Sequence, residues 1–469
     1  MELKPHQHRV LSKGDRPFAL HGTGTGKTLT SLKFIEASDS SKPVILITSS
    51  ALKDNLSKEV DKHNLDIDLS KLHTVTHEGM SRPNISNKVH DLLKDGGTMV
   101  IDEIHKLRNP ASKGYTNTMS ASGLSDRVIG LTGTAIVNNV DDLSSLYGLV
   151  KGEKVRPTSE FIKETEVYDS TLDKILKRNP RTEHSIKDIE GLKENFKDLD
   201  IYYPPGNHPD MPRVIEKTEY VEMPSRQVVG YKLAEKEAIK GRSDLAELAR
   251  KIRKGIELSK TEKAKANAFA SQTSQAAISS ARHVPGEVSS GKLDKAVDDL
   301  KEKLKNNPKH RGVIYSNKIE AGLNPLLDRL STEGLNKKVQ VVSGSTNKSE
   351  VKDIVSDYNS GKKPILVISD SGAEGLDLKG TRSIQILNPH FNDGKIKQAV
   401  GRGARLGSHS HLRERDREVE VTHYHSVMPK TLGLFKSNDQ TIDQGMASIM
   451  KHKADLRDLV LNSIQKRRR

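Results

Sequence analysis

The segment 21–28 reads HGTGTGKT, in which glycines alternate with small residues ahead of a lysine and a threonine. Phosphate groups need many N–H donors and little side-chain bulk, and Gly24 and Gly26 let a backbone curl tightly enough to provide both. A helical pattern begins at about Thr28, so the positive end of a helix would face the anion. We expect Lys27 to reach the β- and γ-phosphates of a nucleotide and the Thr28 hydroxyl to bind Mg²⁺. The predicted nucleotide-binding loop comprises Thr23, Gly24, Thr25, Gly26, Lys27 and Thr28.

Two adjacent carboxylates, Asp102 and Glu103, follow the apolar run 99–101. At the carboxyl end of a buried strand, Asp102 would hold the Mg²⁺ shell, and Glu103 would orient and deprotonate an attacking water. Phosphoryl transfer is mostly positioning plus charge stabilisation, so one base and one metal suffice. His105 is expected to link this site to bound nucleic acid, and a purely structural histidine is the alternative.

The segment 398–405 reads QAVGRGAR and contains two arginines three positions apart. On a helix Arg402 and Arg405 would share one face, with Gln398 one turn earlier. Two guanidinium groups there could neutralise charge building on a γ-phosphate, an effect worth roughly 10³ or more in rate. The alternative is a basic helix surface.

Short apolar runs bounded by turn residues recur in two regions of the chain, with helical patterns between them. Strands that alternate with helices predict parallel sheets with buried strands, and ligands bind beyond the carboxyl ends of such strands. The sequence therefore predicts an α/β fold of two parallel-sheet lobes. The runs are 18–20, 44–47, 99–101 and 128–131 in the first region, and 313–315, 339–342, 365–368 and 384–387 in the second.

Residues from about 151 to 290 change character, with a loop-like stretch followed by an Ala-, Lys- and Glu-rich run. We expect a first, ATP-binding lobe over 1–150, a mainly helical insertion over 151–290, and a second lobe over 291–430. A helical basic tail would follow over 431–469. Its last four residues read KRRR, which could contact phosphates or simply form a solubilising end.

The composition favours a nucleic-acid partner, because the formal net charge is +15 and the pI is about 9.5. Aromatic residues are only 4% and tryptophan is absent, so a broad base-stacking platform is poorly supplied. The absence of cysteine excludes disulfides, thiolate metal sites and cysteine nucleophiles. No apolar run approaches a membrane span and no signal-peptide pattern opens the chain, so we expect no membrane partner. The expected location is the cytoplasm, that of a host for a viral protein, with the nucleus left open.

Segments from both halves of the chain resemble superfamily 2 helicases, and more narrowly the Swi/Snf-type DNA translocases. Residues 102–110 read DEIHKLRNP, close to that family's Asp-Glu-Ala-His-Arg-x-Lys-Asn. Residues 131–139 read LTGTAIVNN, close to Leu-Thr-Gly-Thr-Pro-x-x-Asn-Asn. In the family this second segment couples hydrolysis to nucleic-acid grip, and the resemblance gives that role to Thr132 and Thr134.

Two further segments carry the resemblance, and a third is unlike the Arg-x-Gly-Gln of eukaryotic Swi/Snf-type remodellers. Residues 3–7 read LKPHQ, similar to Leu-Arg-Pro-Tyr-Gln, which implies that Gln7 contacts adenine. Residues 369–378 read SDSGAEGLDL and resemble Gly-Gly-x-Gly-x-Asn-Leu, with Asp377 where Asn is usual. That motif touches nucleotide and phosphate backbone in relatives, which implies the same for Gly375 and Asp377. Residues 405–412 read RLGSHSHL, closer to nucleoside triphosphatases and helicases of large DNA viruses and phages.

The resemblance implies two RecA-like lobes that use ATP and Mg²⁺ to move along nucleic acid, most simply duplex DNA without strand separation. A branch-migrating or unwinding DNA helicase and a viral transcription-associated ATPase that acts on RNA are the alternatives, as is an inactive nucleic-acid scaffold. A polymerase or a replication or recombination factor is a further possible partner. Small hydroxyl residues after the strands would contact phosphates and read backbone rather than sequence. They are Ser49, Ser50, Thr76, Ser316, Thr346 and Ser369.

Overall fold

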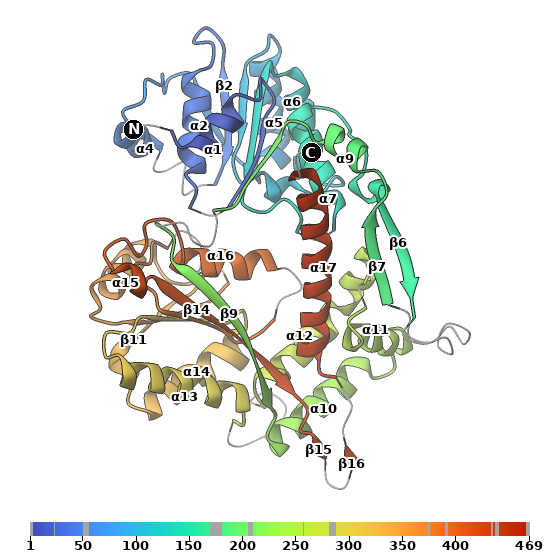
Figure 1. Ribbon diagram of the computed structural model, residues 1–469, viewed down its shortest axis with the longest axis vertical. Coiled ribbons are helices and arrows are strands. Elements are labelled where there is room, and N and C mark those ends of the chain that lie inside the picture. The colour runs from blue at the N-terminus through green and yellow to red at the C-terminus, as the bar shows by residue number, and fades with distance from the viewer. Residues whose placement is uncertain are drawn as a thin grey trace. The chain divides into compact units, whose positions relative to one another are not determined.

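The computed structural model of the chain forms two compact units, one made of residues 1–204 and 453–469 and the other of residues 205–452 (Figure 1). Each unit is described by itself. The residues that the structure describes are 3–22, 24–49, 56–137, 139–168, 181–204, 210–256, 258–280, 288–370, 372, 376–389, 393–432, 435–436 and 440–465.

Unit 1 is built on a six-stranded, all-parallel sheet with the strand order β3-β2-β4-β5-β1-β8. Its central strands are apolar and fully buried because helices cover both faces, as parallel sheets require. The strands are β1 (Phe18–His21), β2 (Val44–Thr48), β3 (Leu72–Thr76), β4 (Thr98–Ile101), β5 (Arg127–Thr132) and β8 (Leu199–Tyr202). The helices are α1 (Pro5–Leu11), α2 (Lys27–Glu36), α4 (Leu56–His63), α5 (Pro83–Leu93), α6 (Lys113–Leu124), α7 (Asp141–Lys151) and α9 (Ile189–Asn195), with short turns at Gly79–Ser81, Ile104–Leu107 and Thr158–Phe161.

Unit 2 repeats the architecture with a second six-stranded parallel sheet, in the order β11-β12-β10-β13-β14-β9. The strands are β9 (Arg213–Glu222), β10 (Gly312–Tyr315), β11 (Val339–Val342), β12 (Ile365–Ile368), β13 (Ser383–Ile386) and β14 (Glu418–Val427). The helices are α10 (Ser225–Ile239), α11 (Ser243–Arg253), α12 (Lys260–Ile278), α13 (Gly291–Asn306), α14 (Asn324–Thr332), α15 (Lys348–Ser360), α16 (Asp393–Gly403) and α17 (Ile442–Gln465), with short helical turns at Ile319–Leu323, Asn336–Lys338 and Glu414–Asp416.

Two antiparallel ribbons complete the chain, β6 (Ile162–Val167) with β7 (Arg181–Ile186) and β15 (Thr431–Leu432) with β16 (Phe435–Lys436). The α/β fold of two parallel-sheet lobes is thus confirmed. In the described part of the chain no helix combines the length and apolar character needed to cross a membrane.

The structure divides the chain differently from the expected insertion over 151–290. Within that range β8 extends the sheet of unit 1 and β9 extends the sheet of unit 2, and only the stretch after β9 is mainly helical. The reason is the weak apolar signal of edge strands. Among the described strands β9 pairs with β14 alone, it alternates exposed and half-buried residues, and β8 is four residues long.

The expected separate tail over 431–469 is also replaced by a shared helix. Ile442, Met446 and Ile449 of α17 pack in a core cluster of unit 2 with α10, α11 and α12. Val460 and Leu461, farther along the same helix, pack in the main core of unit 1. α17 therefore contributes apolar residues to a core cluster of each unit, whereas a separate tail would contribute to neither.

A fully buried ion pair joins Lys292 on α13 to Asp443 on α17. Burial lowers the pKa of Lys292, and the Asp443 carboxylate opposes that shift. Lys292→Met would leave Asp443 charged and buried without its cation. We expect a loss of about 3–5 kcal/mol in the free energy of unfolding, measured by urea denaturation. Lys301→Met breaks the exposed pair with Glu333 and should change stability far less; similar losses in both variants would contradict the prediction.

Candidate nucleotide site

The predicted phosphate loop connects β1 to α2, as its sequence requires. Gly24 and Gly26 have φ of +74° and +84°, a left-handed conformation that glycine adopts without strain. Gly26 directly precedes α2, and the Thr25 hydroxyl donates to the Gly22 carbonyl at 2.7 Å. The backbone therefore curls at the amino end of a helix, which is the geometry expected for anion binding. Thr23 lies outside the described residues.

The Lys27 side chain binds backbone carbonyls of the phosphate loop. The same side chain is predicted to bind the nucleotide phosphates. Its Nζ donates to the carbonyls of His21 and Gly22, each at 3.1 Å. Thr28 follows in the first turn of α2 and is half-buried. A nucleotide phosphate would replace two backbone carbonyls as the partner of the ammonium group.

Gln7 on α1 contacts the loop from the other side and is 2% exposed. Its Nε2 donates to the Gly26 carbonyl at 3.0 Å and to the Thr30 hydroxyl at 3.3 Å, and its Oε1 accepts from the Lys4 N–H at 2.8 Å. The amide nitrogen and the amide oxygen of Gln7 thus both form hydrogen bonds with protein groups. The adenine contact stays a prediction, and it would require the exchange of one of these bonds.

Asp102 lies directly after β4 and is anchored by residues from two neighbouring strands. The Thr48 hydroxyl donates to Asp102 Oδ2 at 3.2 Å, and His77 Nε2 donates to the Asp102 carbonyl at 2.7 Å. Burial and the neighbouring Glu103 charge raise the pKa of Asp102, while Lys27 opposes the shift. A buried carboxylate that lacks enough positive charge around it is suited to a cation.

The donors present fit the predicted Mg²⁺. In the described part of the chain no group of three or more His, Asp and Glu side chains could hold a metal by itself. Mg²⁺ typically uses one or two protein oxygens and completes its shell with substrate phosphates and water. Asp102 and Thr28 would supply such oxygens, and the bound ion would neutralise phosphate charge.

Glu103 has an unusual backbone, with φ of +46° and ψ of +45°. A non-glycine residue in this region costs free energy, and such residues cluster at functional sites. Burial alone would raise the pKa of Glu103, but the hydrogen bond from His105 and the charge of Lys27 outweigh it and lower that pKa. The side chain is therefore held as a carboxylate, the state that a water-orienting base needs.

A short chain of contacts leads from Glu103 to the segment predicted to couple hydrolysis to nucleic acid. His105 Nδ1 lies 3.3 Å from Glu103 Oε2 and 3.0 Å from Thr132 Oγ1. The Thr132 hydroxyl in turn donates to the Thr134 carbonyl and accepts from the Thr134 N–H, both at 3.1 Å. His105 Nδ1 thus contacts both Glu103 and Thr132, and the linking role of His105 stays a prediction.

The other residues predicted in unit 1 follow strands at the same edge of the sheet. Ser49 follows β2, and Thr76 ends β3, paired with Thr48 in parallel register. Thr76 Oγ1 accepts from the Gly79 N–H at 3.0 Å, so it shapes the turn after the strand. Ser50 lies outside the described residues, and phosphate contacts by Ser49 and Thr76 stay predictions.

In unit 2, Ser316, Thr346 and Ser369 follow β10, β11 and β12, whose ends lie in parallel register. Thr346 and Ser369 accept bonds from the N–H groups of Ser343 and Gly372 at 3.0 and 3.3 Å. These hydroxyls stabilise the turns that follow β11 and β12. Their phosphate contacts stay predictions.

Ser316 differs because its side chain is fully buried, with its hydroxyl 3.0 Å from Asn388 Oδ1. This burial argues against the expected direct phosphate contact. The physical reason is that its own turn and the strand-end Asn388 already satisfy the hydroxyl.

The two predicted arginine fingers do not lie on one continuous helix, contrary to expectation. Arg402 is in the last turn of α16, but that helix ends at Gly403 and Arg405 lies beyond it. Burial lowers the pKa of Arg405, whose guanidinium forms an ion pair with Asp377. The aspartate that stands in place of the usual asparagine thus binds Arg405.

The remaining assignments in this region stay open. Gln398 is half-buried on α16, and Gly375 lies outside the described residues. The finger role of Arg402 and Arg405 and the nucleotide contact of Asp377 stay predictions.

The sequence pattern missed several residues that build the site. Thr48 ends β2 and His77 directly follows β3, so the rule that placed Asp102 at a sheet edge could have found them. Asp200 and Tyr202 could not be found this way, because they come from β8, far along the chain from the loop that they contact.

Comparisons with known proteins point in one direction. A family model described as "Helicase conserved C-terminal domain" matches residues 295–407. A protein of Acanthamoeba polyphaga mimivirus named as an ATP-dependent RNA helicase is 29% identical over 432 residues, which cover 91% of this chain and 89% of the relative. A killer-plasmid helicase of Kluyveromyces lactis is 24% identical over 454 residues, 90% of this chain and 64% of that protein. Nucleoside triphosphatase I of Heliothis armigera entomopoxvirus is 28% identical over 134 residues, 27% of this chain and 20% of that protein.

Two solved structures align over most of the chain but superpose poorly as wholes. The SWI2/SNF2 ATPase core of Sulfolobus solfataricus in complex with dsDNA covers 91% of this chain at 19% identity, with a TM-score of 0.34 and 88% of its own chain aligned. The Hef helicase domain of Pyrococcus furiosus covers 90% of this chain at 13% identity, with a TM-score of 0.47 and 95% of its own chain aligned. Similarity at this level carries no argument about activity.

Proposed function

We propose that this chain, which is a superfamily 2 helicase of viral type and a nucleic-acid-dependent ATPase, uses ATP hydrolysis to move along duplex DNA. The contacts of His105 Nδ1 with Glu103 and with Thr132 carry this proposal. A base that only hydrolysed ATP would need no such connection to a segment at another strand end. The connection gives bound nucleic acid a means to change the position of the base.

We assign each residue of the hydrolytic site a role. The loop backbone and Lys27 bind the β- and γ-phosphates, and Asp102 and Thr28 would hold Mg²⁺. Glu103 orients the attacking water and accepts its proton, and the family resemblance gives Arg402 and Arg405 the role of supplying further positive charge. Movement along nucleic acid would follow from cycles of binding and hydrolysis.

Duplex DNA is the proposed track because three segments of unit 1 resemble Swi/Snf-type translocases. The net charge of +15 provides the attraction to a polyanion. Four described residues at strand ends are small and hydroxyl-bearing, namely Ser49, Thr76, Thr346 and Ser369, and the chain lacks tryptophan, so contacts to backbone phosphates are favoured over base stacking.

An RNA-dependent ATPase associated with viral transcription is the second candidate. It is favoured by the mimivirus relative, which is named as an RNA helicase. Copurification with an RNA polymerase would support it.

Hydrolysis of ATP in the presence of different nucleic acids tests the proposal. Purified protein would be assayed alone and with single-stranded DNA, duplex DNA, forked or four-way DNA and RNA. We expect duplex DNA to stimulate most, and affinity for it to fall steeply between about 50 and 200 mM salt. Strongest stimulation by RNA would favour the second candidate, and by branched DNA a branch-migrating helicase. Salt-independent binding would contradict the phosphate-contact picture.

A further inference from the structure

The last strand of unit 1 packs against the phosphate loop through buried side chains. β8 pairs in parallel with β1, and in that register His21 lies opposite Tyr202. The Gly22 N–H donates to the Tyr202 carbonyl at 2.9 Å. Pro204 follows two residues later, at the point where unit 1 ends and unit 2 begins. The chain thus leaves unit 1 beside the loop that would bind phosphate.

His21 occupies the first position of the loop, where a strict phosphate-loop pattern has glycine, and its side chain is fully buried. Its Nε2 lies 2.8 Å from Asp200 Oδ2 on β8. Its Nδ1 is buried without a hydrogen-bond partner in the described structure. An unsatisfied buried nitrogen is costly, so this ring is poorly explained as packing alone. The hydrogen bond with Asp200 is the polar contact that the His21 ring makes.

Asp200 is itself 4% exposed and also binds Arg9, a cation on α1. Arg9 Nε and Nη2 donate to its two carboxylate oxygens at 2.6 and 3.0 Å. Burial would raise the pKa of Asp200, but the hydrogen bonds from His21 and Arg9 outweigh it and lower that pKa. The carboxylate therefore stays ionised between a loop residue and a helix residue.

Further contacts of β8 surround the same loop. The Tyr202 ring stacks on His6 of α1 with centroids 3.9 Å apart, and His6 Nε2 donates to the Thr25 carbonyl at 2.9 Å. A Cβ on Gly22 would lie 3.2 Å from Tyr203 Cδ1 and 3.3 Å from Pro204 Cδ. The loop backbone is thus confined by the residues that lead out of the unit.

We propose that Asp200 is a positioning residue for nucleotide binding, acting through His21 on the loop that carries Lys27. The carbonyl of His21 accepts a hydrogen bond from Lys27 Nζ. The residue that Asp200 contacts, His21, therefore also binds the Lys27 ammonium group in this structure. Displacement of β8 would move His21, and with it the carbonyl that binds Lys27 Nζ. This inference rests on the proposed function, because it assigns a role within the same ATP site.

The test compares nucleotide affinity among variants that remain folded. Asp200→Asn and His21→Leu should weaken binding of a fluorescent MgADP analogue by roughly tenfold, because the loop loses its fixed position. His21→Gln keeps a donor near the place of Nε2 and should bind nearly as well as the wild type. The KM for ATP should rise in the first two variants while kcat changes less.

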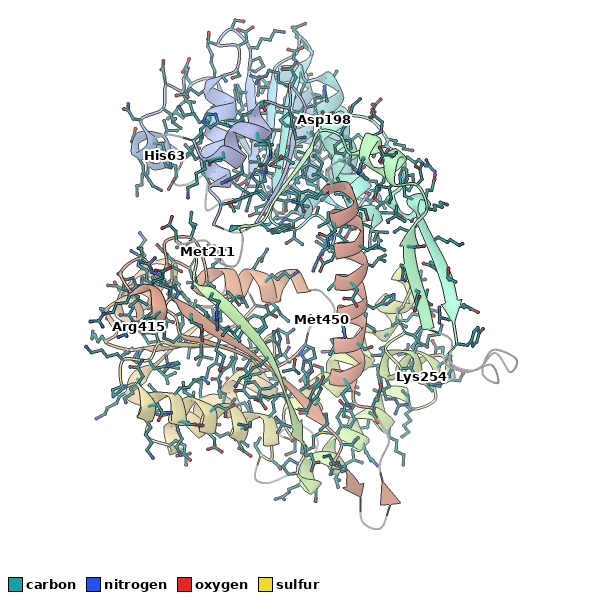
Figure 2. All side chains as sticks on the ribbon, viewed as in Figure 1. His63, Asp198, Met211, Lys254, Arg415 and Met450 are labelled. Carbon is teal, nitrogen blue, oxygen red and sulfur yellow. The ribbon has the colours of Figure 1, made fainter. Side chains whose placement is uncertain are left out.

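Asp198→Asn is the matched control, and Asp198 is labelled in Figure 2. This residue directly precedes β8 and pairs with Lys151 instead of the phosphate loop. Its loss should lower stability and leave nucleotide affinity unchanged. If Asp200→Asn does not fold, the contrast between His21→Leu and His21→Gln still decides the question.

The outcomes separate this inference from the proposed function. Equal affinity in folded His21→Leu, Asp200→Asn and wild-type protein would overturn the positioning role and leave the ATPase proposal intact. Equal weakening by His21→Gln and His21→Leu would also overturn it, since the hydrogen bond would then not matter. Wild-type protein that binds no MgADP would overturn the proposed function, and this inference with it.

Discussion

Glu103→Gln is expected to reduce ATP hydrolysis by about 10²–10⁴-fold and to leave nucleotide binding intact. The substitution keeps the shape of the side chain and removes the carboxylate that would orient water and accept its proton. Lys27 and the glycines that form the phosphate loop do not change, so the phosphates should still bind. Single-turnover hydrolysis and binding of a fluorescent MgADP analogue would measure the two effects separately.

Glu78→Gln is a suitable control, because Glu78 is an exposed carboxylate that follows a strand in the same unit. It should hydrolyse ATP at the wild-type rate. Undiminished hydrolysis by Glu103→Gln would show that the base has been assigned to the wrong residue. Loss of both binding and hydrolysis would point instead to a damaged loop.

The phosphate loop and the carboxylate pair could be predicted because their signals are local. A buried strand, two glycines with positive φ and a helix start all lie within residues 18–28. The same holds for Asp102, which follows a strand whose four residues are all buried. Short-range patterns of this kind also gave both parallel sheets, since each central strand is a compact apolar run.

The edge strands and the long-range contacts could not be predicted for the opposite reason. Most of the exposed positions of β9 hold polar residues, and its partner β14 lies about two hundred residues later in the chain. The contact of His21 with Asp200 joins residues 179 positions apart, and nothing near either residue signals the other. What looked like a departure from the glycine pattern at position 21 becomes intelligible only once β8 lies beside β1.

Asp377 illustrates a third case, in which the sequence showed an unusual residue without its consequence. The substitution of the usual asparagine was visible, but its ion pair with Arg405 depends on where α16 ends. A helix that continued through Arg405 would have directed the guanidinium elsewhere. The chain stops its helix at Gly403, where a Cβ would lie 3.0 Å from Thr381 Cγ2 and 3.1 Å from Ile384 Cδ1.

Arg405→Ala is expected to reduce the rate of ATP hydrolysis by about 10³-fold while MgADP affinity changes little. A finger stabilises charge that develops on the γ-phosphate during transfer, so its loss should act on kcat more than on binding. Arg405→Lys should restore only part of the rate, because a lysine lacks the planar fork of a guanidinium. Arg415→Ala removes an exposed arginine of unit 2, labelled in Figure 2, and should leave kcat unchanged.

Asp377→Asn separates catalysis by Arg405 from a structural role of its ion pair. This variant keeps the arginine and removes only the charge that holds it. If Arg405 is a finger, Asp377→Asn should retain far more activity than Arg405→Ala, since the guanidinium can still reach a phosphate. If both variants lose the same activity, or if Arg405→Ala hydrolyses ATP at the wild-type rate, the finger assignment is wrong. Thermal unfolding of each variant would show whether unit 2 remains folded, so that a lost rate can be attributed to chemistry.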